Sequence, residues 1–175
     1  MLSNLECNRW IFPQVNIEYL VVKKSENVMF FLSLFAAPLL SCNFERDLCN
    51  WQQDKSENLD WTRDSGGTAT SGTGPSFDHT TGGKSGYYIY TEASVNNNKT
   101  ARLISPSLGV SSTVCVNFWY HMYGANINRI NLRLKHAGSL GQPLWTKIGN
   151  QGNQWINAKV DVMPQNGDMV YLSCL

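Results

Sequence analysis

Alternation of apolar and polar residues is the feature of this chain that most constrains its fold. In the segments INLRLK (130–135) and WINAKVDV (155–162), aliphatic residues alternate with polar ones. Because successive side chains of a strand point to opposite faces, both segments predict half-buried antiparallel strands. No stretch after Cys42 shows helical spacing, and Gly-, Pro-, Asn- and Ser-rich turns separate the segments. We therefore expect an all-β protein, either a sandwich or a barrel.

Composition limits the domain count and the class of partner. The chain has 175 residues, of which 42% are hydrophobic, enough for one core. Fourteen Lys+Arg against thirteen Asp+Glu give a net charge of +1, so nothing favours nucleic acid or an anionic membrane as partner. The five cysteines show neither a C-x-x-C pair nor the Cys–His spacing of a zinc site. Disulfides in an oxidising compartment explain them better.

An apolar run near the N-terminus resembles a secretory signal. Lys23 and Lys24 precede thirteen residues, Val28 to Leu40, that only Ser33 interrupts. A membrane-spanning helix needs about 20 apolar residues, whereas the apolar region of a signal peptide has about 7–15. We therefore interpret residues 1–41 as a signal-like leader or a wrongly assigned gene start, and residues 42–175 as the domain. The alternative is a buried helix or strand.

Several motifs that suggest catalysis lack the rest of the machinery. RDSGG (63–67) is typical of the nucleophile segment of trypsin-like proteases, but there the histidine precedes the serine, and the first histidine here, His79, follows Ser65. GGKS (82–85) ends like a phosphate-binding loop, yet Asp78 occupies the position of the required earlier glycine. The sequence therefore predicts a protein that is not an enzyme. Asn98, in NKT, is a candidate glycosylation site.

A series of landmarks resembles the MAM domain, the extracellular module named for meprin, the neuropilins and receptor protein tyrosine phosphatase mu. In order, they are CNFERDLCNW, Trp61, GPSFDHTTGGKSGYYIY, ARLISPSL, CVNFWYHMYG and LWTKIGNQGNQWINAKVDV. The resemblance runs from Cys42 to about Val162. It implies a jelly-roll β-sandwich of two antiparallel sheets, in agreement with the alternating segments.

In such a sandwich CVNFWYHMYG (115–124) would be a central strand. Residues 115, 117, 119, 121 and 123 would share one face, and residues 116, 118, 120 and 122 the other. A core role is favoured over direct ligand contact, because burial of such rings explains their presence. The predicted core aromatics are Trp51, Trp61, Phe118, Trp119, Tyr120, Trp145 and Trp155.

The resemblance also implies disulfides. Family members usually pair their first two cysteines, here Cys42 and Cys49. A second bridge would begin at Cys115, and its family partner lies after paired aspartates in a final strand that this sequence lacks. Two alternatives stay open: Cys174 replaces that partner, or the sequence ends before it. We expect a domain without its last strand, with an unpaired sheet edge, marginal stability and a tendency to associate.

Some family members hold a calcium or sodium ion near the first cysteines and the final strand. By that resemblance, Glu45, Asp47 and Asp78 are candidate ligands for a structural Ca or Na ion. The alternative is that they are ordinary surface acids. No other cofactor is expected.

The resemblance implies a non-catalytic extracellular adhesion or receptor-type module. It would be secreted or part of the ectodomain of a membrane protein, and would bind an extracellular protein, either a second copy or a different one. The module would be attached to a membrane only as part of a longer parent protein. The alternative is a carbohydrate-binding sandwich that stacks sugars on Tyr88, Trp145 and Trp155. A secreted hydrolase acting through Ser65 is the weakest reading.

Overall fold

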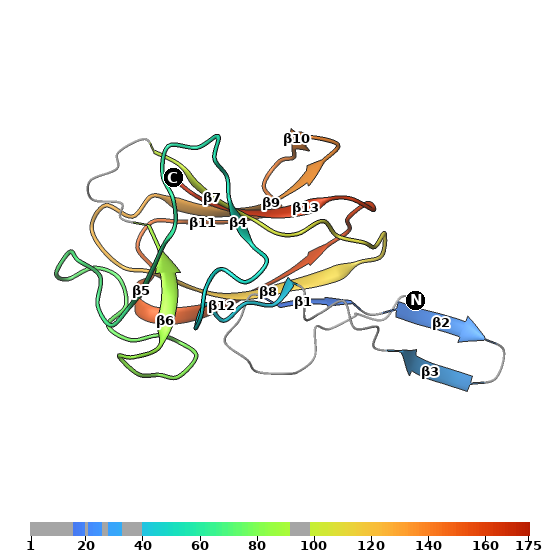
Figure 1. Ribbon diagram of the computed structural model, residues 1–175, viewed down its shortest axis with the longest axis horizontal. Coiled ribbons are helices and arrows are strands. Elements are labelled where there is room, and N and C mark those ends of the chain that lie inside the picture. Colours follow the sequence, from blue (N-terminus) through green and yellow to red (C-terminus); the bar gives the residue numbers. More distant parts are fainter. Residues whose placement is uncertain (1–15, 20, 26–27, 33–39, 92–98) are drawn as a thin grey trace.

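The computed structural model describes residues 16–19, 21–25, 28–32, 40–91 and 99–175 (Figure 1). The elements with described bounds are all strands. They are β1 (Asn16–Tyr19), β2 (Val21–Ser25), β3 (Val28–Leu32), β4 (Gln52–Gln53), β5 (Thr62–Ser65), β6 (Tyr87–Tyr90), β7 (Ala101–Ile104), β8 (Val114–Met122), β9 (Arg129–His136), β10 (Ser139–Leu140), β11 (Trp145–Ile148), β12 (Gly152–Val162) and β13 (Met169–Cys174).

Two antiparallel sheets form the body of the molecule. The three-stranded sheet has the order β1-β8-β12. The six-stranded sheet has the order β10-β9-β13-β7-β4, with β11 also beside β9. Figure 1 shows them as two layers, with the hairpin β5–β6 across one end. The predicted all-β sandwich is confirmed.

The core lies between the sheets, and strand periodicity decides which side chains enter it. Along β8, buried and partly buried residues alternate without exception, so that Val114, Val116, Phe118, Tyr120 and Met122 face inward. Aliphatic residues at alternate positions of β9 and β12 join the same cluster: Ile130, Leu132, Leu134, Ile156, Ala158, Val160 and Val162. The two faces predicted for β8 and β12 are confirmed. In β9 the aliphatic residues join the core as predicted, but Asn131, on the face predicted to be polar, is also buried.

The last strand of the chain is an interior strand. β13 pairs with β9 on one side and with β7 on the other. In the three-stranded sheet, β1 pairs with residues Val114–Asn117 of β8. Beyond Asn117, β12 is the neighbour that the described strands supply to β8. Among the described strands, the second half of β8 thus has a neighbour on one side only, and β12 is the other edge of this sheet. The missing last strand and the tendency to associate stay predictions.

The apolar run near the N-terminus contains a strand. Val28–Leu32 forms β3, which pairs with β2 in a two-stranded sheet of its own, whereas residues 33–39 lie outside the described part of the chain. Figure 1 shows this hairpin projecting away from the two sheets. An isolated two-stranded hairpin of this kind is marginally stable in water. The signal peptide stays a prediction.

Candidate interaction surface

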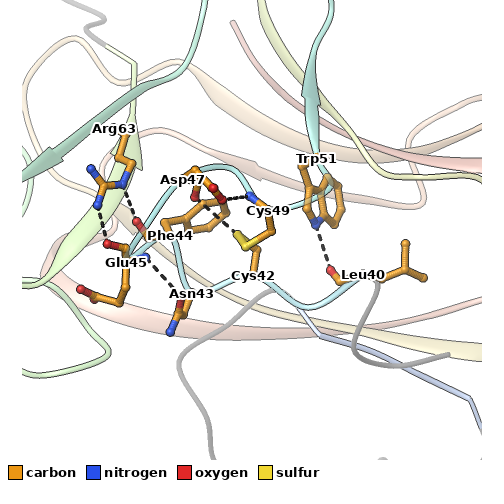
Figure 2. The surroundings of a disulfide bond; sticks show 9 residues. All are labelled: Leu40, Cys42, Asn43, Phe44, Glu45, Asp47, Cys49, Trp51 and Arg63. Carbon is orange, nitrogen blue, oxygen red and sulfur yellow. Dashed lines mark hydrogen bonds between the residues drawn. A yellow bond between two sulfur atoms is a disulfide. The ribbon is translucent and has the colours of Figure 1, made fainter. Parts of the chain in front are cut away.

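The loop that opens the domain is closed by a disulfide between Cys42 and Cys49 (Figure 2), as the resemblance implied. Within it Phe44 and Cys49 have positive φ angles of 60° and 53°. Asp47 stabilises the turn, because its carboxylate accepts a hydrogen bond from the backbone N–H of Cys49 at 2.6 Å. The loop is therefore held by both a covalent bond and an Asx-type turn.

Arg63 ties this loop to the hairpin β5–β6. Its guanidinium donates to the carbonyl oxygens of Phe44 and Glu45, at 2.6 and 2.5 Å, as Figure 2 shows. The same group lies 3.5 Å from the ring centre of Tyr87. The RDSGG motif thus has a structural use: Arg63 anchors the loop, and Ser65 pairs with Tyr87 within the hairpin.

Of the two alternatives for the second bridge, the one in which Cys174 replaces the family partner of Cys115 is wrong. Cys115 is disulfide-bonded, but Cys174 is a free thiol, and the partner of Cys115 lies outside the described residues. Cys115 is near the start of β8, whereas Cys174 lies in the other sheet and lines a cavity with Met122, at the end of β8. The seven residues of strand from Cys115 to Met122 span about 23 Å. This distance is far beyond the reach of a disulfide. Burial raises the pKa of the Cys174 thiol to about 12.

The three candidate metal ligands are engaged separately. Glu45 accepts a hydrogen bond from the N–H of Tyr87, Asp47 from Cys49, and Asp78 from residues of its own turn. Within the described part of the chain, no three His, Cys, Asp or Glu side chains come together as metal ligands would. The structural ion therefore stays a prediction that this geometry does not support.

Asp78 organises the turn between residues 78 and 86. Its side chain is 0% exposed and accepts hydrogen bonds from the hydroxyl and N–H of Thr81 and from the N–H of Gly83. Burial alone would raise the pKa of Asp78, but these hydrogen bonds outweigh it and hold the pKa below the ordinary value. Gly86 lies against the carboxylate, where a Cβ atom would clash.

An aromatic strip lies on the outer face of the three-stranded sheet. We define it as Trp119, His121 and Tyr123 from the β8 segment and Trp155 from β12, all partly buried. The register shifts between Gly152 and Ile156, so that this stretch of β12 has more residues than the stretch of β8 that it pairs with. Such a bulge re-aims side chains. Here the ring of Trp155 lies 5.4 Å from that of His121, and Asn153 Oδ1 accepts a hydrogen bond from His121 Nε2 at 3.1 Å.

The loop that carries Asp78 covers one end of the aromatic strip. The ring of His79 stacks on Trp119 with a centroid distance of 3.7 Å. Trp155 Nε1 donates to the carbonyl oxygen of Phe77 at 3.0 Å. Burial lowers the pKa of both His79 and His121, more strongly than the Asp78 charge and the Asn153 hydrogen bond respectively raise it. Burial therefore favours the neutral form of both imidazoles.

The predicted core positions of two tryptophans are wrong. Trp51 (3% exposed), Phe118 and Tyr120 are in the core, and Trp61 and Trp145 pack against it. Trp119 and Trp155 belong to the aromatic strip, since period two places position 119 opposite to position 118. The strip contact between His79 and Trp119 joins distant segments of sequence, and no local pattern could have found it.

The residues proposed for sugar stacking do not share one surface. Trp145 packs edge-on against Phe118 and Tyr120, at 5.1 and 5.2 Å between ring centres. Trp155 instead contacts Tyr88, at 5.9 Å, on the outer side of the three-stranded sheet. A platform made of all three candidates is therefore absent.

Two further features bear on location. Asn98, the candidate glycosylation site, lies outside the described residues. Over the part of the chain that is described, no helix has the length and apolar character needed to cross a membrane.

The comparisons with known proteins agree with the fold. The family model "MAM domain, meprin/A5/mu" matches residues 42–172. The chain is 38% identical to mouse MAM domain-containing glycosylphosphatidylinositol anchor protein 2 over 141 residues, 70% of this chain. It is 38% identical to zebrafish (Danio rerio) neuropilin-1a over 135 residues, 72% of this chain, and 42% identical to human MAM domain-containing protein 2 over 123 residues, 69% of this chain. The match spans 15%, 14% and 18% of the lengths of these three relatives.

Proposed function

Because the chain belongs to the MAM domain family, we propose that it is a non-catalytic extracellular module that binds a protein partner through the aromatic strip. The match to the MAM family model, and relatives that include a glycosylphosphatidylinositol anchor protein and a neuropilin, support this class of function. The matched relatives are much longer than this chain, and we propose that a parent protein gives the module its attachment to a membrane.

The observation that carries the proposal is the aromatic strip on the outer face of β8 and β12; the exposed charges of this face, Lys159 and Asp161, lie farther along β12. Tryptophan, tyrosine and histidine are partly buried there beside neutral amides, such as Asn117 and Asn157, whose side chains hydrogen-bond to each other at 2.7 Å. Aromatic residues are enriched, and charged residues depleted, at the centres of protein interfaces. A preformed aromatic surface on a rigid sheet also loses little conformational entropy on binding.

The partner can be a second copy of the chain or a different protein, and one experiment separates the two. The full chain, secreted from eukaryotic cells, is clustered on beads. These are mixed with beads that carry the same chain and, separately, with a panel of living cells. Clumping of beads would indicate homophilic contact, and retention on cells would indicate a different surface partner. Absence of both would contradict the proposed function.

A matched pair of variants tests the surface. Asn153→Arg places a long cation at the edge of the aromatic strip, where Asn153 is exposed. We expect binding to weaken at least about tenfold, since an unpaired charge in an interface is costly. Gln142→Arg adds the same side chain at an exposed position between β10 and β11, in the other sheet, and should leave binding unchanged. Equal effects of both variants would contradict the proposed surface.

A further inference from the structure

A cavity of about 930 Å³ follows the second half of β8. Every residue from 118 to 122 lines it, whereas residues 114 to 117, the stretch that β1 covers, do not. The lining includes both faces of β8, with Phe118 on the inner face and Trp119 on the outer face. Because β12 closes the other side of the strand, a space that reaches both faces passes along the edge that β1 leaves open.

The backbone of β8 presents hydrogen-bonding groups along this edge. The carbonyl oxygen of Met122 accepts a hydrogen bond from the N–H of Gln151, on the side of β12. Backbone groups of successive strand residues alternate in direction, so the N–H and C=O groups of Trp119 and His121 point away from β12, to the open edge. Among the described residues, no backbone hydrogen bond reaches them there.

The open stretch has two defined ends. At one end β1 pairs with Asn117. At the other end the N–H of Gly74 donates to the carbonyl oxygen of Tyr123 at 3.0 Å. The stretch between them has the length of an ordinary strand, about 5–6 residues. An unpaired strand edge is a template for a further strand, and extended peptides bind to other sheets in this way.

A strand added at this edge would meet aromatic and aliphatic side chains on both of its faces. On the outer face its neighbours across the strands would be Trp119 and His121 of the aromatic strip. On the inner side Trp61, Ile89 and Ile127 line the cavity, pack against the core and are only partly buried. Cross-strand contacts of this kind stabilise a sheet, so the edge suits a segment with large apolar side chains.

The charged residues that line the cavity are cations. Lys99 and Arg129 both line it and are exposed, and no Asp or Glu of the described ranges does so. The salt bridges found among the described residues involve neither cation. A carboxylate of an incoming segment would be attracted to either position, and a lysine or arginine would be repelled. The cavity therefore favours an acidic occupant.

From these observations we propose that an extended, acidic segment of the partner pairs with the open edge of β8 and adds a strand to the three-stranded sheet. Its backbone bonds to Trp119 and His121, its outer side chains contact the aromatic strip, and its carboxylates lie toward Lys99 or Arg129. This inference rests on the proposed function, because the aromatic strip lines the same cavity. It specifies the element by which the partner binds.

Amide hydrogen exchange of the full secreted chain, measured residue by residue by NMR, tests the edge without any partner. We expect the N–H groups of Trp119 and His121 to exchange at least about a hundredfold faster than those of Phe118 and Tyr120, because the latter pair face β12 and exchange only when the sheet opens. Slow exchange at all four positions would show that the edge is already paired, and would overturn the proposal.

The probe for binding is the tightest peptide selected by the full chain from a phage-displayed library of random heptapeptides. We expect selected sequences to contain Asp or Glu, and the probe to bind below about 1 mM. Methylation of its backbone nitrogens, one at a time, should weaken binding at least about tenfold at alternate positions and be tolerated at the positions between them. Selection of no peptide, or methylation effects without alternation, would overturn the proposal.

The same peptide localises the site. Its binding should protect the N–H groups of Trp119 and His121 from exchange. Arg129→Gln and Lys99→Gln should weaken binding about two- to fivefold where they contact a carboxylate, the effect of an exposed ion pair. Lys84→Gln is the matched control, because Lys84 is exposed and does not line the cavity. Absence of protection, equal losses in all three variants, or no loss in any would contradict the proposed pairing.

A second copy of the chain is the competing occupant of the edge. In that case the amides of Trp119 and His121 would become protected as the concentration of the chain rises, with no peptide present. Such protection would overturn the acidic segment as the occupant.

Failure of this inference is distinguishable from failure of the proposed function. A partner that binds the chain, loses binding in Asn153→Arg and is not displaced by excess peptide would overturn strand pairing alone. Absence of both bead clumping and retention on cells would instead contradict the proposed function, whatever the exchange rates along the edge.

Discussion

The indole of Trp51 donates a hydrogen bond to the backbone carbonyl oxygen of Leu40 over 2.9 Å, in a buried position (Figure 2). Both residues are 3% exposed and belong to the core cluster. This bond links the chain just before the disulfide loop to a core residue just after that loop. The folded unit therefore includes Leu40, two residues before Cys42.

Trp51→Phe should keep most of the ring's packing but leave the Leu40 carbonyl unpaired. We expect the free energy of unfolding to fall by about 1–3 kcal/mol, measured by urea denaturation. Trp119→Phe is the comparison, because Trp119 lies on the outer face of β8. A loss for Trp51→Phe no larger than that for Trp119→Phe would contradict the importance of the bond. A chain that begins at Cys42 should be destabilised in the same way.

Removing the disulfide by Cys42→Ala together with Cys49→Ala should lower the free energy of unfolding by about 2–3 kcal/mol, the value for closing so short a loop. Cys174→Ser should change it little, since Cys174 is a free thiol. Thermal unfolding under non-reducing conditions checks both. A larger effect at Cys174 than at the paired cysteines would contradict the assigned bridges.

Gly86→Ala should destabilise the turn that Asp78 organises, because the added methyl group would collide with the buried carboxylate. We expect a loss of about 1–3 kcal/mol, the range for overpacking. Gly67→Ala is the matched control, as nothing lies near the position of its Cβ atom and its φ angle is not positive. Circular dichroism during heating compares the two, and similar melting temperatures would contradict the account of the turn.

Acid should unfold the protein through buried carboxylates. Asp168 is 3% exposed, and burial alone would raise its pKa. Its carboxylate accepts hydrogen bonds from the N–H of Gln165 and, at 2.7 Å, from His136, and these outweigh the effect of burial. The pKa of Asp168 is therefore lowered, like that of Asp78. A lowered pKa stabilises the folded state above the ordinary value of 3.8, and that contribution disappears as the pH falls through and below this value.

Urea denaturation at several pH values measures this dependence. Asp168→Asn should flatten the loss of stability below about pH 4, whereas Asp60→Asn, at an exposed residue paired with Lys55, should leave the profile unchanged. An unaltered acid profile in Asp168→Asn would contradict the role of this carboxylate.

Strand periodicity explains why the fold could be predicted from the sequence. The alternation in β8, β9 and β12 fixes which residues face the core without any knowledge of the partner strands. The same rule shows why the core prediction was wrong for Trp119: both faces of β8 carry large rings, and composition does not tell which face another sheet covers. Only the contacts of His79 and Trp155 with Trp119 and His121 show how the outer face is used.

The wrong alternative for Cys174 has a different cause. A short loop such as Cys42–Cys49 brings its ends together locally, so its pairing follows from sequence resemblance. The position of Cys174 depends on β13 lying between β9 and β7, which is a long-range arrangement.

The central claim is that this chain is a disulfide-bonded extracellular module, and the most direct test is intact mass with non-reducing peptide mapping of the protein secreted from eukaryotic cells. The account predicts secretion, a Cys42–Cys49 bridge, a free thiol at Cys174 and a glycan on Asn98. Retention inside the cell with Cys42 and Cys49 reduced would contradict it.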